Sequence, residues 1–270
     1  MRTIRFVATA LAAVFVTTPG GVRAQGTASP PADEIMRRAQ QAFYYTGQDF
    51  AAKVGMRLVD KTGRERRRSL SMLRLNAKQG HNQKYYMYFH APADVRGTAL
   101  LVWKYPDKDD DRWLFIPAIK LVTRIAAKDN QASFVGSDFT YEDVSGRDLG
   151  ADAHKLLREE AIAGRDCYVV ESNPKAASAF SRKVSWIDKT WFLPVKEEYY
   201  DVQKDLLRVF TADEVKEIKG HPTAVRRTMK NLKTGHYTEV VFENPDYDAG
   251  LEEGLFSERS LQTPPAKWIQ

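Results

Sequence analysis

Residues 50–58, Phe-Ala-Ala-Lys-Val-Gly-Met-Arg-Leu, decide the class of fold. The residues that alternate there with more polar neighbours are Phe50, Ala52, Val54, Met56 and Leu58. A period of two is that of a strand with one face buried and the other turned to solvent. Residues 60–63, Asp-Lys-Thr-Gly, then have the composition of a turn. The stretch therefore predicts antiparallel β structure in which one face of a sheet meets a core.

Strand-like segments recur along most of the chain. They cover residues 66–75, 84–89, 98–105, 112–116, 120–125, 165–171, 180–187, 195–200, 206–214, 224–231 and 236–243. Helical spacing is confined to residues 33–45 and 148–157, with a short turn or helix at 249–256. About eleven strands with short connections are typical of a meandering antiparallel sheet, which must curl or be covered at its edges. We therefore expect a mainly β fold with a few helices.

The N-terminus has the pattern of a secretory signal peptide over residues 1–24. Arg2 and Arg5 precede an apolar run at 6–16 that is too short to span a bilayer, and Val22-Arg23-Ala24 has small residues at a cleavage site. Gln25 follows where a lipoprotein would carry cysteine, so we expect a soluble periplasmic protein without a lipid anchor. Residues 25–32 are expected to be a disordered linker, 33–262 one domain, and 263–270 an exposed tail.

Net charge and cysteine content limit the possible partners and exclude an intramolecular disulfide. The net charge is +6, and removing the three arginines of the signal peptide leaves about +3. This excess suits transient contact with anionic lipid headgroups, while export argues against nucleic acid as a partner. Cys167 is the only cysteine, so an intramolecular disulfide is impossible, and its apolar neighbours predict a buried, inert thiol.

Catalytic and metal-binding patterns are absent from the sequence. The five histidines, at 81, 90, 154, 221 and 236, have neither His-x-His nor HExxH spacing. Ser137 follows a glycine directly and lacks the GxSxG arrangement of a nucleophile elbow. The sequence therefore predicts a protein that is not an enzyme and holds no cofactor or metal.

Residues 92–147 are the most informative block. The segments Leu100–Trp103 and Trp113–Ile116 are apolar on both faces, whereas a half-exposed strand alternates. Either the protein's own elements or an apolar ligand must cover the second face. Residues 139–143, Phe-Thr-Tyr-Glu-Asp, then combine aromatic and acidic side chains as a capping loop does, and Arg124 and Arg147 are the nearest candidate partners.

This block resembles the signature of the outer membrane lipoprotein-sorting proteins, relatives of LolA. The matching positions are Gly97, Trp103, Trp113 to Pro117, Arg124 and Phe134-x-Gly136-Ser137-Asp138-x-x-Tyr141-x-Asp143. The resemblance implies a half-open antiparallel β-barrel, lidded by helices, around an apolar cavity for lipid-modified cargo carried across the periplasm. It also implies an RND-type inner-membrane exporter as a partner. No motif identifies lipoprotein as the cargo, and fold alone does not fix function.

Three functions remain open at this point. The chain is expected to be a carrier for a lipid or acylated molecule; the alternatives are an adaptor of an RND-type exporter and an envelope hydrolase. For the carrier, the residues expected to line the cavity are Val54, Met56, Leu58, Leu101, Trp103, Trp113 and Phe115. The helix at 33–45 and the loop at 134–143, with Phe134 and Tyr141, would close it. Arg124 would form a latch with Asp138 or Asp143.

Overall fold

In the described part of the chain, the strands form one antiparallel sheet of thirteen members. The computed structural model describes residues 29–77, 82–106 and 108–269, so the predicted signal peptide lies outside the described residues. The strands are β1 (Asp49–Val59), β2 (Glu65–Asn76), β3 (Gln83–Ala91), β4 (Ala99–Lys104), β5 (Asp111–Ile116), β6 (Leu121–Ile125), β7 (Asp152–Ile162), β8 (Arg165–Pro174), β9 (Arg182–Asp188), β10 (Pro194–Tyr200), β11 (Leu206–Ile218), β12 (His221–Asn231) and β13 (His236–Tyr247).

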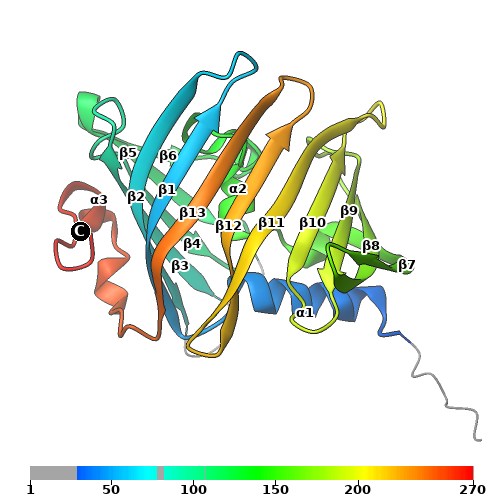
Figure 1. The fold of residues 1–270 in the computed structure, drawn as a ribbon. Coiled ribbons are helices and arrows are strands. Elements are labelled where there is room, and N and C mark those ends of the chain that lie inside the picture. Colours follow the sequence, from blue (N-terminus) through cyan, green and yellow to red (C-terminus); the bar gives the residue numbers. More distant parts are fainter. Residues whose placement is uncertain (1–28, 78–81, 107, 270) are drawn as a thin grey trace, which may run out of the picture.

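The strand order is that of two meanders that are joined by the pairing of the first strand, β1, with the last strand, β13. It runs β6-β5-β4-β3-β2-β1-β13-β12-β11-β10-β9-β8-β7, so the first strand pairs with the last, as between Val54 and Phe242. The free edges are β6 and β7, which follow one another in the sequence. The sheet is curved and open, as Figure 1 shows, and its register shifts add bulges that increase local twist. The expected half-open β fold is confirmed, with thirteen strands instead of about eleven.

One face of the sheet, here called the inner face, carries the larger core. The alternating residues of β1 lie on it, together with Leu70, Met87 and Phe242 from other strands. The connection between the two edge strands packs onto this face, and it contains α2 (Tyr141–Ser145) and the 3-10 turns Ala127–Asp129, Phe134–Gly136 and Leu149–Ala151. Hence the segment that links the edges also covers the core between them.

Helix α1 (Ala32–Tyr44) lies across one end of the sheet, below β7–β12 in the view of Figure 1. Its acidic first turn suits the positive end of the helix dipole. Ile35, Met36 and Ala39 are buried in one cluster with apolar residues of β8 and β9. At its C-terminal end, Arg74 of β2 donates hydrogen bonds to the carbonyls of Tyr44, at 2.7 Å, and Thr46. These bonds satisfy carbonyls near the helix end that have no partner within the helix.

The C-terminal segment covers the opposite, outer face of β2–β5. It contains the 3-10 turn Glu253–Leu255 and α3 (Glu258–Gln262), which lies outside the sheet in Figure 1. Phe256 and Leu261 are fully buried there, and the indole N–H of Trp103 donates to the Phe256 carbonyl at 2.9 Å. Trp268 and Ile269, which belong to the tail expected to be exposed from residue 263, are partly buried against this cluster, whereas Thr263, Ala266 and Lys267 are exposed.

The predicted helix at 148–157 is also wrong. Asp148 caps a single 3-10 turn, because its carboxylate accepts from the N–H of Gly150, and the chain then enters β7. β7 pairs with β8 over its whole length. Leu149, Ala153 and Leu156 have a helical spacing, but a short apolar pattern of this kind does not distinguish helix from strand, and pairing with β8 decides the outcome.

Candidate functional site

A cavity lies between the inner face of the sheet, α1 and the connection between the edge strands. We call residues 130–147 of that connection the lid. The cavity volume is about 140 Å³. Its apolar lining comes from the strands, from α1 and from the lid: Met36, Ala39, Phe43, Val54, Met56, Leu70, Met72, Met87, Phe134, Phe139, Val144, Leu149, Phe180, Ile187, Pro194, Phe210, Met229, Val240 and Phe242. Five methionines give this wall soft, adaptable side chains.

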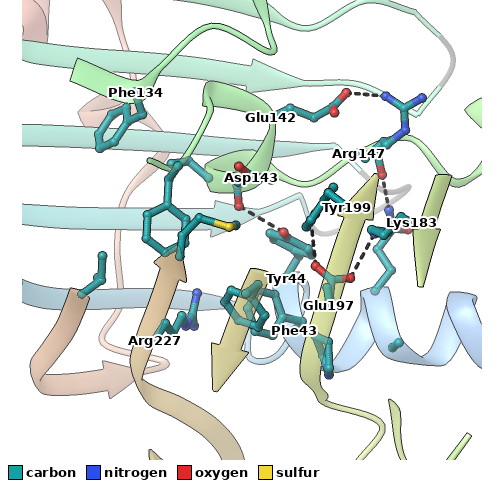
Figure 2. Close-up of a pocket in the computed structure, with 18 of the residues that line it drawn as sticks. Phe43, Tyr44, Phe134, Glu142, Asp143, Arg147, Lys183, Glu197, Tyr199 and Arg227 are labelled. Atoms are coloured by element: carbon teal, nitrogen blue, oxygen red, sulfur yellow. Dashed lines mark hydrogen bonds and ion pairs between the residues drawn. The ribbon is translucent and has the colours of Figure 1, made fainter. Parts of the chain in front are cut away.

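The cavity is smaller than the several hundred cubic ångströms expected for a lipid carrier. A volume near 150 Å³ accommodates a molecule of about the size of benzene. Phe43 and Phe134 are among the aromatic side chains that line the cavity (Figure 2). A cavity of this volume is too small for a long acyl chain, so binding one would require α1 or the lid to move away from the sheet.

The lid is built from the motif at 134–143. Phe134 and Tyr141 are buried, and their rings meet edge to face at 5.8 Å between centroids. Thr140 and Asp143 form a capping box at the start of α2: the Asp143 carboxylate accepts from the Thr140 N–H at 2.8 Å, and the Thr140 hydroxyl accepts from the Asp143 N–H at 3.1 Å. The motif thus folds the lid on itself and directs its aromatic side chains to the core.

Polar contacts hold the lid to the sheet. Arg208 of β11 donates from both terminal nitrogens to the Asp143 carboxylate, at 2.6 and 3.2 Å, and both side chains are only 12% exposed. The Asp138 carboxylate accepts from the hydroxyl of Thr238 on β13 at 2.7 Å. Together these contacts form what we call the latch. The prediction that Arg124 forms the latch is wrong. Arg124 lies on the edge strand β6, its side chain is 66% exposed, and it pairs with Asp111 of β5.

A second group of charges surrounds the cavity nearer α1. Arg147 pairs with Asp152 of β7 and with Glu142 of α2, each at 2.9 Å. The side-chain amide of Gln40 in α1 donates to the Arg147 carbonyl at 2.8 Å, and Lys183 pairs with Glu197 at 3.0 Å. Figure 2 shows the Arg147–Glu142 and Lys183–Glu197 pairs at the cavity. The contacts of Arg147 connect α1, the lid and β7, and they lie beside the apolar packing of α1 and of the lid aromatics against the sheet.

Burial shifts the pKa values of the latch groups. Burial acts to lower the pKa of the Arg208 guanidinium, but the charge of Asp143 and its hydrogen bonds outweigh this effect and the pKa is raised. Burial also raises the pKa of Asp138, and the hydrogen bond from Thr238 only partly offsets it. Burial therefore disfavours the charged form of Asp138, whereas the carboxylate of Asp143 favours the charged form of Arg208.

The structure divides the residues expected to line the cavity between two faces. Val54 and Met56 line it, and their binding to a ligand stays a prediction. Leu58 belongs to the inner core but does not line the cavity. The placement of the other four is wrong: Leu101, Trp103, Trp113 and Phe115 all pack on the outer face with the C-terminal segment. Successive residues of β4 point to opposite faces, so Leu100 and Val102 are inner and Leu101 and Trp103 are outer.

Sequence reasoning missed three polar residues on the inner face. Arg208 and Arg227 lie two positions before the inner residues Phe210 and Met229, and Thr238 lies two before Val240. The period of two would place all three on the inner face once the direction of each strand is known. Arg227 lies between the polar residues Arg226 and Thr228, whereas Arg208 lies between Leu207 and Val209, so the neighbours alone do not assign either arginine to a face.

Other chemistry is not assembled in the part of the chain that the structure describes. Over residues 29–77, 82–106 and 108–269, no group of three or more His, Cys, Asp or Glu side chains could hold a metal ion. The Ser137 hydroxyl donates to the Phe139 carbonyl within the lid, which is a structural role. Across the same ranges, no helix is both long and apolar enough to cross a bilayer.

The curved antiparallel sheet with a lidded apolar cavity has a LolA-like fold, and comparisons identify the family. A family model described only as an uncharacterized-protein-like family matches residues 81–263. A DUF1329 family protein from Desulfovibrio piger is 30% identical, with a TM-score of 0.80, over 87% of this chain and 100% of that one. The chain therefore belongs to the DUF1329 family.

Two further solved structures share the fold. One is a domain from Vibrio parahaemolyticus whose name assigns it to the outer membrane lipoprotein-sorting proteins; it is 30% identical, with a TM-score of 0.79, over 86% of this chain and 98% of that one. The other is a LolA superfamily protein from Nitrosomonas europaea, 22% identical, with a TM-score of 0.67, over 86% and 99%. No curated protein matches the chain. The resemblance seen in the sequence is thus confirmed at the level of family and fold.

Proposed function

We propose that the protein is a periplasmic carrier that binds a lipid or a lipid-modified cargo in the lidded cavity and transfers it between membranes. The observation that carries the proposal is an apolar cavity whose cover is held by polar contacts as well as by its buried aromatic side chains. A permanent core would be closed by apolar packing throughout. Here the latch and the pairs of Arg147 can be broken and remade in water, which suits a cover that opens for loading and release.

The energies involved are compatible with ligand-driven opening. Each buried methylene contributes ~0.8 kcal/mol, so a chain of about ten methylenes would contribute ~8 kcal/mol before the costs of association. Breaking a buried ion pair such as Arg208–Asp143 costs ~3–5 kcal/mol if one charge is left without a partner, and less if both charges reach water. The apolar gain therefore exceeds the cost of opening one such pair.

The tip between β5 and β6 offers a surface for the membrane step. Ile119 and Leu121 are 64% and 47% exposed there, and Lys120 lies between them. Apolar side chains flanking a cation suit the interface of an anionic bilayer, where the ammonium meets phosphate and the apolar groups reach the acyl region. We propose that this tip makes the transient membrane contact.

A matched pair of substitutions tests the carrier proposal. Val54→Phe adds bulk to the cavity wall, whereas Val122→Phe adds the same bulk on the outer face of β6, where the side chain is half-buried. Native mass spectrometry of protein isolated from the periplasm, with lipid extraction, should detect bound lipid in the wild type and Val122→Phe. Val54→Phe should lose most of it while keeping its melting temperature within a few degrees.

Two results would overturn the proposal. If Val54→Phe retains the lipid of the wild type, the cavity is not the binding site. If the wild type carries no lipid and takes up none from vesicles, the protein is not a carrier. The adaptor role beside an RND-type exporter then becomes the better reading, with the exposed Ile119–Leu121 tip as its protein contact.

A further inference from the structure

Arg227 of β12 lines the cavity, and in the part of the chain that the structure describes no opposite charge lies beside its guanidinium. Arg227 pairs in register with Val240 of β13 and lines the cavity. Its Nε–H donates to the Ala224 carbonyl at 2.9 Å. Among the described residues, no carboxylate lies within 4.0 Å of its guanidinium, and its two terminal nitrogens make no hydrogen bond to the protein. These donors are therefore available to a ligand.

Two aromatic rings fix the position of this guanidinium. Its central carbon lies 4.3 Å from the centroid of Phe43 in α1 and 4.4 Å from that of Phe242 in β13. Figure 2 shows Arg227 beside Phe43 at the cavity. Cation–π contacts of this kind restrict the planar group without using its donors. Arg227 is thus held in place, as a binding group should be before its ligand arrives.

The other charges that line the cavity already have partners. Arg147 is neutralised by Asp152 and Glu142, and Lys183 by Glu197. Asp143 belongs to the latch, and Asp148 is exposed. Hence Arg227 is the lining cation, among the residues described, whose charge no carboxylate balances.

The surroundings of Arg227 make its charge costly while the cavity is empty. Burial lowers the pKa of its guanidinium to about 10. The buried Arg74 of β2 adds a second positive charge in the same region, and the Nε of Arg74 has no hydrogen-bond partner among the described residues. A negative group between the rings and the apolar wall would remove this penalty.

We propose that Arg227 is the anchor for the anionic headgroup of an acylated ligand. A carboxylate or a phosphate has the paired oxygens that accept two parallel N–H bonds from a guanidinium. The acyl chain would then lie along the apolar wall formed by residues such as Met56, Met229 and Val240. The inference rests on the proposed carrier function and adds to it the chemical class of the ligand.

The test compares ligands of equal chain length but different headgroup. The assay measures displacement of a fluorescent fatty-chain probe from the full mature protein at pH 8. It compares two ligand pairs: palmitate with hexadecanol, and lysophosphatidate with lysophosphatidylcholine. The first member of each pair is anionic. Arg227→Gln removes the charge and Arg227→Lys keeps it without the planar fork. Arg226→Gln is the matched control, because its side chain is 41% exposed and pairs with Glu214 and Glu239. The wild type should prefer the anionic ligand of at least one pair by about tenfold or more.

Arg227→Gln should lose the preference for the anionic ligand while binding the uncharged or zwitterionic ligand within about threefold of wild type. Arg227→Lys should keep part of the preference, because it keeps the charge without the planar fork. Arg226→Gln should keep all of the preference. The pair of ligands in which the preference appears identifies carboxylate or phosphate as the headgroup. A preference unchanged in Arg227→Gln, or equal binding of both members of each pair by the wild type, overturns the anchor but leaves the carrier function standing. Wild-type protein that binds none of the four ligands overturns the carrier function itself.

Discussion

Loss of the latch should open the lid without unfolding the sheet. Arg208→Met removes the bidentate partner of Asp143 and leaves a carboxylate that is 12% exposed. Such a group costs ~3–5 kcal/mol if it stays buried. Since opening the lid returns it to water, the closed state loses about that energy relative to the open one. At 1.4 kcal/mol per tenfold change, the open population should rise at least about 100-fold.

The assay is hydrogen exchange followed by mass spectrometry, together with the rate of uptake of an apolar fluorescent probe. Peptides from residues 130–147 should exchange faster in Arg208→Met, whereas peptides from β2 and β3 should not. The double variant Arg208→Met/Asp143→Asn should recover part of the protection, because no charge is then left unpaired. Arg124→Met, which removes an exposed ion pair, should leave the lid unchanged. Equal acceleration in the lid and in β2–β3 would refute a lid that opens as a separate unit.

Two further predictions follow from buried titratable groups. Burial lowers the pKa of His154 below its usual 6.5, despite a hydrogen bond to the Leu149 carbonyl that acts in the opposite direction. The unfolded chain therefore takes up this proton first, and the free energy of unfolding should fall as the pH is lowered from about 6.5 towards the folded pKa. Denaturant titrations between pH 5 and 8 should show a smaller fall in His154→Gln; an identical fall would exclude this histidine as a cause. Burial also raises the pKa of the Cys167 thiol to about 11, so iodoacetamide at pH 8 should label it only in denaturant, and equally fast labelling of the native protein would contradict its inert environment.

Local patterns in the sequence predict most of the sheet. The alternation at Phe50–Leu58 is retained in β1, where Phe50, Val54 and Met56 are all buried on one face. The helix predicted at 33–45 is α1, shifted by one residue. Both rest on interactions between near neighbours in the chain, which is the information that periodicity carries.

The assignment of side chains to faces needed long-range information. Leu101 and Trp103 looked like cavity residues because nothing near them in the sequence explains a second apolar face. Phe256 and Leu261, some 150 residues away, provide that cover. A strand that is apolar on both faces must be covered on both. Its sequence does not show which face lies towards the cavity and which towards the C-terminal segment. The strand register and the path of the C-terminal segment determine that assignment.

The prediction named the two acidic residues of the latch, Asp138 and Asp143, but the wrong arginine. Asp138 and Asp143 do hold the lid, because they belong to a compact local motif. Their partners come from β11 and β13, about 65 and 100 residues further along. Arg124 was nearer in the sequence, but it follows the edge strand β6 away from the lid. Proximity in sequence was a poor guide because the strand order places the two halves of the chain side by side.

That strand order also has a consequence for how the chain acquires its structure. Residues 49–125 and 152–247 each form a meander of neighbouring strands, and the two halves of the described sheet pair through β1 and β13. During synthesis or passage through a membrane pore, β1 emerges early, whereas β13 is the last strand to emerge. The pairing of Val54 with Phe242 can therefore form only after most of the chain has emerged. Contacts of such separation are slow to form. A chain arrested before residue 236 would therefore keep the inner side chains of β1 accessible to a chaperone or a protease, and would become resistant only after the final strand is released.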